Sequence, residues 1–153
     1  MGMVGQYILV TDEELNKIKN KELDIYFKES DLDIDKSWQL LHFILCGEIG
    51  GGEPPLGHVV PLNDSIINND SLGTFYLTAS EVEEAYLAIK DLREPDFKEM
   101  YNFQDLMDEQ LYPLVEDDDP NEIFEYTYSY FLEIKGLYKQ AVLNKQCVIF
   151  FIS

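Results

Sequence analysis

Short apolar runs bounded by polar residues predict three strands. Residues 6–10 read Gln-Tyr-Ile-Leu-Val, which is rich in the β-branched and aromatic side chains that favour strands. Residues 74–77 have the same character, and a third run covers residues 146–152. From Cys147 this third run is apolar at every position. A strand that is apolar on both sides needs cover on both faces, so we expect it to be central in its sheet.

Capping residues followed by apolar side chains at helical spacing predict three helices. Thr11 with Glu14, and Thr78 with Glu81, have the spacing of a capping box, in which each side chain accepts from the other residue's backbone N–H. Asp119-Pro120 places Pro at the first helical position, where its missing N–H costs nothing. The predicted helices span residues 12–20, 79–93 and 120–144.

A fourth helix is predicted over residues 33–46, with Asp33 or Asp35 as its cap and Gly47 as its stop. Its inner face would lie against the sheet. The apolar side chains at helical spacing are Ile34, Trp38, Leu41 and Leu45.

The remaining segments are less regular. Residues 50–52 are three glycines and predict a loop, and residues 58–62 suggest a short strand. Residues 97–101 and 103–111 suggest two short helices, whereas residues 23–27 favour no element. The order of strands and helices contains no repeat and no long linker. We therefore expect an α+β fold, in which one domain over residues 1–153 packs five to six helices on a small mixed sheet.

Charge narrows the classes of function. The 153 residues include 11 Lys and Arg and 30 Asp and Glu, for a formal net charge of −19. Hydrophobic residues make up 46%, which is too apolar for a disordered acidic chain. Nucleic acids and anionic membrane surfaces are bound mainly through Lys and Arg, so neither is an expected partner. A basic protein is the partner that this charge favours.

The ends and cysteines indicate a cytoplasmic protein. Residues 1–6 lack the basic and apolar regions of a signal peptide, and no apolar run approaches membrane-spanning length. Cys46 and Cys147 lie far apart in the sequence, and we expect both to be reduced core residues.

Negative charge is densest near the start of the long predicted helix. The acidic residues there can cap that helix and complement its dipole, or they can form a binding patch for a basic partner. We expect the tyrosine that follows to lie off the helix's apolar face and to join the patch. The candidate partner-binding residues are Glu116, Asp117, Asp118, Asp119, Glu122 and Tyr128.

A second candidate site is a pocket around Lys36, Trp38 and His42. Trp38 and His42 are four residues apart and so are neighbours on one helix face. In the functional interpretation, Lys36 binds an anion, Trp38 stacks on the ligand and His42 acts as general acid or base. In the structural interpretation, which we favour, Trp38 fills the core, His42 bonds a backbone carbonyl and Lys36 pairs with Asp33 or Asp35.

Complete catalytic and metal-binding motifs are absent from the sequence. Asp31, Asp33 and Asp35 begin like a calcium loop, but Lys36 stands where that loop needs Gly, and His42 where it needs Glu. The two histidines, His42 and His58, do not form a zinc motif, and no Gly-x-Ser-x-Gly or Cys-His signature is present. We therefore expect no metal and no cofactor, and whether the protein is an enzyme stays open.

Residues 32–47 carry the most specific family signal. They read Leu-Asp-Ile-Asp-Lys-Ser-Trp-Gln-Leu-Leu-His-Phe-Ile-Leu-Cys-Gly and follow a Met1-Gly2-Met3 start. This stretch resembles the acidic-Lys-x-Trp-x-x-Leu-His pattern, closing on Leu-Thr-Gly, of the YfbM-like family of bacterial proteins. Cys46 stands where the family usually has Thr. The resemblance covers the whole chain and implies a fold and a cytoplasmic bacterial setting, but no mechanism.

Two hypotheses of function follow. The first is a non-enzymatic acidic module that binds a basic protein, and an immunity-type role, neutralising a basic toxin, is one version of it. The alternative is a small-molecule-binding protein or enzyme that uses the pocket of Lys36, Trp38 and His42.

Overall fold

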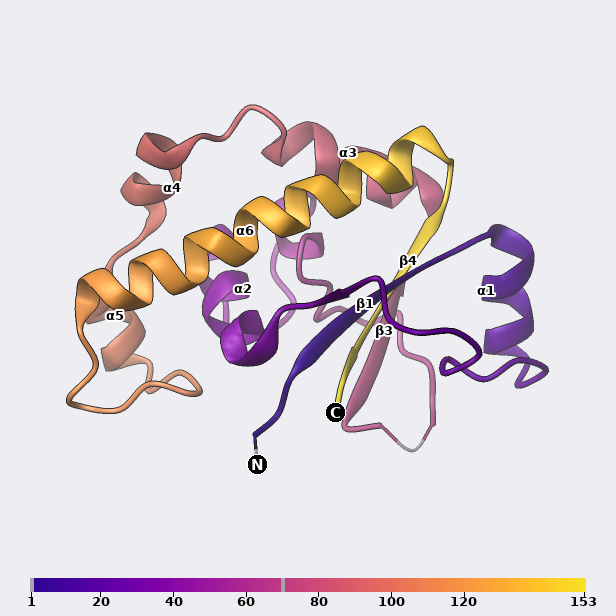
Figure 1. Ribbon diagram of the computed structural model, residues 1–153, viewed down its shortest axis with the longest axis horizontal. Helices are drawn as coiled ribbons and strands as arrows, with labels where there is room; N and C mark the ends of the chain where they lie inside the picture. The colour runs from indigo at the N-terminus through magenta and orange to yellow at the C-terminus, as the bar shows by residue number, and fades with distance from the viewer. Residues whose placement is uncertain (1, 70) are drawn as a thin grey trace.

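The computed structural model describes residues 2–69 and 71–153 (Figure 1), so Met1 of the family resemblance lies outside it. The strands are β1 (Gly5–Val10), β2 (Leu32–Asp33), β3 (Gly73–Leu77) and β4 (Cys147–Ile152). The helices are α1 (Asp12–Lys19), α2 (Trp38–Cys46), α3 (Ala79–Ile89), α4 (Glu94–Met100), α5 (Phe103–Asp108) and α6 (Pro120–Leu143), with short 3-10 helices η1 (Asp35–Ser37) and η2 (Leu56–His58).

The strands form one sheet in the order β2-β1-β4-β3. β4 pairs with β1 along its whole length, from the Gly5–Ile152 pair to the Val10–Cys147 pair, and with β3 on its other side. The predicted α+β fold and the central position of the last strand are confirmed. Every pairing among the described strands is antiparallel, whereas we expected a mixed sheet. The apolar run of β4 indicates that both faces of the strand are covered. It does not indicate whether the neighbouring strands run parallel or antiparallel to it.

Alternate side chains of β4 enter two separate apolar cores. One core lies between the sheet and α2, α3 and α6, and Figure 1 shows α6 running across that side of the sheet. The second, smaller core lies on the other face, under α1. The first core receives Val148, Phe150 and Ile152, and the second receives Cys147, Ile149 and Phe151. Cys147 is therefore a buried free thiol as expected, whereas Cys46 is half-buried.

The helix caps predicted at Thr11, Thr78 and Asp119, and the helix stop at Gly47, are confirmed. Thr11 and Thr78 each form a capping box with a glutamate three residues on, and Asp119 accepts a hydrogen bond from the Glu122 backbone N–H at 2.9 Å. Gly47 ends α2 in the left-handed conformation, at φ 78°. The helix predicted over residues 79–93 ends earlier, at Ile89.

The prediction that Asp33 or Asp35 caps a helix is wrong. Asp33 lies in β2, and its carboxylate accepts from the Asp35 backbone N–H at 2.7 Å. This local bond accompanies a left-handed backbone at Asp35, φ 53°, a conformation that Asp tolerates better than most residues. The chain then makes the η1 turn, and α2 begins at Trp38.

The strand suggested over residues 58–62 is also absent. That segment is a mostly buried loop that begins in η2. Side chains bond its carbonyl groups in place of a neighbouring strand: Tyr7 and Tyr138 each donate to Val59 O at 2.7 Å. A buried loop needs partners for its backbone groups, and here they come from elements far away in sequence.

The outer edge of β1 is closed by side chains where β2 stops. The Leu9 backbone N–H donates to the Asp31 carboxylate at 2.7 Å, and Lys28 Nζ donates to Leu9 O at 2.6 Å. Asp31 and Lys28 also pair with each other at 3.2 Å. The two charges block an edge that could otherwise pair with another chain. In the described part of the chain, every helix is too short or too polar to cross a membrane.

Candidate functional site

Two residues of the candidate pocket, Trp38 and Lys36, are held by contacts with other parts of the fold. Trp38 is 7% exposed, its indole Nε1 donates to Met3 O at 2.9 Å, and its ring lies 6.0 Å from that of Tyr112. Lys36 is half-buried, and its backbone N–H donates to the Tyr126 hydroxyl at 3.1 Å. Among the described residues, Lys36 forms no ion pair within 4.0 Å, so the expected pairing with an aspartate of the preceding turn is not formed.

His42 is fully buried in α2. Its Nδ1 lies 2.7 Å from Val60 O, a geometry in which the neutral ring donates from Nδ1, while Nε2 has no partner among the described residues. Burial lowers the pKa of His42, and the carbonyl groups of Val60 and Gly51 and the carboxylate of Glu48 oppose this shift. His42 is therefore a neutral residue that holds the buried loop against α2.

The three candidate residues lie outside the most prominent surface concavities. Three surface concavities stand out in the described part of the chain, and Lys36, Trp38 and His42 line none of them. Two of these concavities adjoin Tyr26, and the third lies between Pro54-Pro55 and α3. The geometry favours the structural interpretation for Trp38 and His42.

The buried state of His42 predicts a pH-dependent stability. Because folding lowers its pKa below the ordinary value of 6.5, the stabilisation is complete above that pH and is lost as the pH falls toward the folded-state value. The loss is at most about 1.4 kcal/mol per pH unit for one proton. Urea unfolding of the wild type and His42→Gln at about pH 7.5 and about pH 5.5 measures it. The stability advantage of the wild type should shrink at the lower pH, and an advantage that is equal at both would contradict this role.

The three aspartates that begin like a calcium loop are used by the fold. Asp31 closes the β1 edge with Lys28, and Asp33 holds the turn before η1. Asp35 accepts a hydrogen bond from the Tyr126 hydroxyl at 2.8 Å, which ties this turn to α6. Groups of three or more metal-binding side chains are not found among the described residues.

The acidic candidate residues divide into two groups. Asp118 accepts from the Val115 backbone N–H at 2.8 Å, and Asp119 caps α6. Glu116, Asp117 and Glu122 are exposed. Asp119 therefore has the expected helix-capping role and Asp118 holds the turn before α6, while the other three carboxylates are available on the surface.

Tyr128 differs from the exposed tyrosine that we expected. It is half-buried, and its ring packs 5.3 Å from that of Phe97 and 5.8 Å from that of Phe124. Burial raises its pKa, with smaller contributions from Glu94 and Glu125. Tyr128 thus belongs to the aromatic layer between α4 and α6, with carboxylates at its rim.

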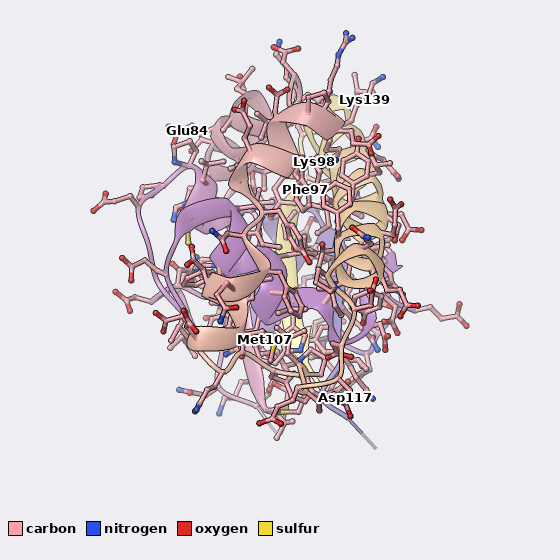
Figure 2. All side chains as sticks on the ribbon, turned by 90° about the vertical axis from the view of Figure 1, so that its left-hand side faces the viewer. Glu84, Phe97, Lys98, Met107, Asp117 and Lys139 are labelled. Carbon is pink, nitrogen blue, oxygen red and sulfur yellow. The ribbon has the colours of Figure 1, made fainter. Side chains whose placement is uncertain are left out.

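The fold extends the acidic run into a larger surface, which we call the acidic face and define as the Asp and Glu side chains of residues 94–125. This stretch holds 12 Asp and Glu and a single base, Lys98, so it carries −11 of the net charge of −19. All of these acids except Asp118 are exposed. Figure 2 shows the stretch as one end of the molecule, formed by α4, α5, the loop near Asp117 and the start of α6.

Few cations offset the acidic face. Within the described residues, the ion pairs shorter than 4.0 Å lie elsewhere, and Lys98 lies over the Phe124 ring at 6.0 Å.

Burial and the nearby Asp119 raise the pKa of Tyr101 to about 12. The Tyr101 hydroxyl donates to Pro120 O at 2.7 Å, which fixes α6 against the end of α4.

The contribution of α4 and α5 to this face does not show in the sequence as a motif. The four consecutive acids of residues 116–119 do, because they are adjacent. The acids of α4 and α5 are interleaved with apolar residues that pack inward, such as Phe97 and Leu106. A count of charges over a window of about thirty residues, the scale of a few short helices, carries the signal that a motif search does not.

Comparison with known proteins identifies the family. The family described as "Domain of unknown function (DUF1877)" matches residues 1–151. The chain belongs to this family. Its fold is similar to that in the crystal structure of YfbM from Escherichia coli, a protein of unknown function, with a TM-score of 0.79 and 18% sequence identity over 98% of this chain and 99% of that chain. No curated protein matches the chain.

The comparisons confirm the predicted YfbM-like resemblance. For this DUF1877 protein they establish the family and, at 18% identity, a shared fold. Neither description carries an activity, so an account of function has to come from the residues themselves.

Proposed function

We propose that this protein is a non-enzymatic binding module that receives a basic partner protein on its acidic face. The observation that carries the proposal is the concentration of −11 of the −19 charges in residues 94–125, at one end of the molecule. Charge that only keeps a protein soluble is expected to be spread over its whole surface, without a large region of one sign.

A surface with this charge attracts a cationic protein over distances of about a Debye length, roughly 8–10 Å at physiological salt. Such attraction raises association rates and excludes acidic competitors by repulsion. The rim of the aromatic layer adds apolar area beside the charges, because Tyr128 is only half-buried. Aromatic side chains are enriched in protein interfaces, and a polar rim surrounds the apolar centre.

An immunity-type role is one concrete version of this function. In it, the partner is a toxin whose basic surface binds nucleic acid, and the acidic face competes for that surface in the bacterial cytoplasm. The arrangement supports such a partner because a basic surface that binds phosphates is complementary to a dense row of carboxylates.

Charge reversal tests the proposal. Glu116→Lys with Asp117→Lys changes two exposed carboxylates whose side chains form no hydrogen bond with the residues that the structure describes. Glu22→Lys with Glu29→Lys is the matched control, because these acids are also exposed and produce the same change in net charge. In Figure 1 their segment lies beside α1, at the other end of the molecule from α5.

Each protein is immobilised and used to capture proteins from a bacterial extract at about 0.05 M and about 0.5 M salt. We expect basic proteins that the wild type and the control retain at low salt, that high salt releases, and that the acidic-face variant does not retain. The proposal fails if the two double variants retain the same proteins in the same amounts.

A further inference from the structure

A shallow apolar groove lies between the Pro54-Pro55 segment and α3. It is lined by Pro54, Pro55, Glu84, Leu87 and Ala88 and has a volume of about 480 Å³. Pockets that hold small-molecule ligands have volumes of about 300–1,000 Å³, and a single side chain is smaller than such a ligand. The groove can therefore accept a large side chain.

Leu87 stands out as the exposed apolar member of this groove. It is 55% exposed, whereas the buried face of α3 is already complete with Val82, Ala85 and Ile89. Leu87 therefore adds nothing to the core and presents its side chain to solvent next to the two prolines. Together with the prolines it forms an exposed apolar patch, and such patches mark interaction sites when polar residues rim them.

The charges around the groove point to the chemistry of its occupant. Glu84 is one of its lining residues, and Glu53 and Glu83 are the chain neighbours of Pro54 and Glu84. All three carboxylates are exposed, and none forms an ion pair among the described residues. The nearest base along α3 is its C-cap, Lys90.

We propose that this groove binds one large apolar side chain, aromatic or aliphatic, that stands between Lys or Arg residues in an extended segment of a partner protein. The apolar side chain packs between the prolines and Leu87, and the flanking cations meet Glu53, Glu83 and Glu84. A second copy of this chain is a poor occupant, because two molecules of charge −19 repel each other.

This inference rests on the proposed function in that it assigns the same basic partner a second, apolar contact. Figure 2 places Glu84 and Asp117 at opposite ends of one view of the molecule, so the groove and the acidic loop are separate contact areas. The two proposals can therefore fail independently.

The test uses two synthetic peptides, Lys-Arg-Trp-Arg-Lys and Lys-Arg-Ala-Arg-Lys, and NMR titration of the full chain. We expect the tryptophan peptide to shift the methyl signals of Leu87 and Ala88 and to bind about ten-fold more tightly than the alanine peptide. Leu87→Ser should weaken the tryptophan peptide to the level of the alanine peptide. Leu132→Ser is the matched control, since Leu132 is an exposed leucine of α6 at 47% exposure, and it should leave binding unchanged.

Equal affinity of the two peptides, or equal loss in the two serine variants, would overturn the groove proposal. A concentration-dependent dimer that Leu87→Ser abolishes would also overturn it, by assigning the groove to a second copy. If the tryptophan peptide instead responds to Glu116→Lys with Asp117→Lys and not to Leu87→Ser, the groove proposal fails while the acidic face is supported.

Discussion

Replacement of Phe150 by alanine is expected to lower the free energy of unfolding by about 3–5 kcal/mol. Phe150 is fully buried at the middle of the central strand, and its ring lies 4.9 Å from that of Tyr7. The ring also packs against Gly5, where an added Cβ would lie 2.7 Å from a ring carbon. Such close packing on several sides leaves little room for collapse, so the substitution leaves a cavity.

Urea unfolding followed by circular dichroism measures this loss. Leu143→Ala is the control, because Leu143 is 73% exposed at the end of α6 and its removal should cost less than about 0.5 kcal/mol. A loss below about 1 kcal/mol for Phe150→Ala would show that β4 is not the central, doubly covered strand described above.

Removal of the hydroxyl groups of Tyr7 and Tyr138 together is expected to destabilise the protein by more than the sum of the single changes. Both hydroxyls donate to Val59 O at 2.7 Å, so either one alone leaves this buried carbonyl bonded. Each single Tyr→Phe change should cost about 1 kcal/mol. The double variant leaves Val59 O without a partner and should cost about 1–3 kcal/mol beyond the sum.

Urea unfolding of the wild type, both single variants and the double variant gives the coupling energy directly. Tyr26→Phe is a control, because Tyr26 is 62% exposed. If the two single losses simply add, the two tyrosines do not share an acceptor and another interaction holds the loop over residues 58–62.

The parts of the fold that were predicted correctly are encoded by neighbouring residues. The capping boxes at Thr11 and Thr78 need a hydroxyl and a glutamate three residues apart, and the sequence displays both. The central position of β4 follows from six consecutive apolar residues, which need cover on both faces wherever the strand lies.

The parts that were missed depend on contacts between distant residues. The two residues of β2 are too few for a pattern, and they pair with Gln6 and Tyr7 across a connection that contains α1. The loop near Val59 looked like a strand because it is apolar. Its apolarity instead reflects burial beneath helices, with its carbonyl groups bonded by Tyr7, Tyr138 and His42.

In the candidate site, too, the features encoded by neighbouring residues were predictable and those that depend on distant contacts were not. The exposed carboxylates Glu116, Asp117 and Glu122 could be found from charge density alone, and the capping role of Asp119 from the proline after it. The partial burial of Tyr128 could not be predicted from the sequence, because it depends on α4, whose Phe97 packs against the ring. His42 was placed on the correct helix face, but its backbone partner Val60 belongs to a loop that no local pattern predicts.

Stopped-flow measurement of the association rate between this protein and a purified basic partner, across a range of salt concentrations, shows whether the acidic face binds the partner. We expect salt to slow association steeply for the wild type and for the control variant Glu22→Lys with Glu29→Lys. Glu116→Lys with Asp117→Lys should associate about ten-fold more slowly at low salt, and its rate should depend less on salt. Equal rates and equal salt dependence for the two double variants would contradict the claim that the acidic face receives the partner.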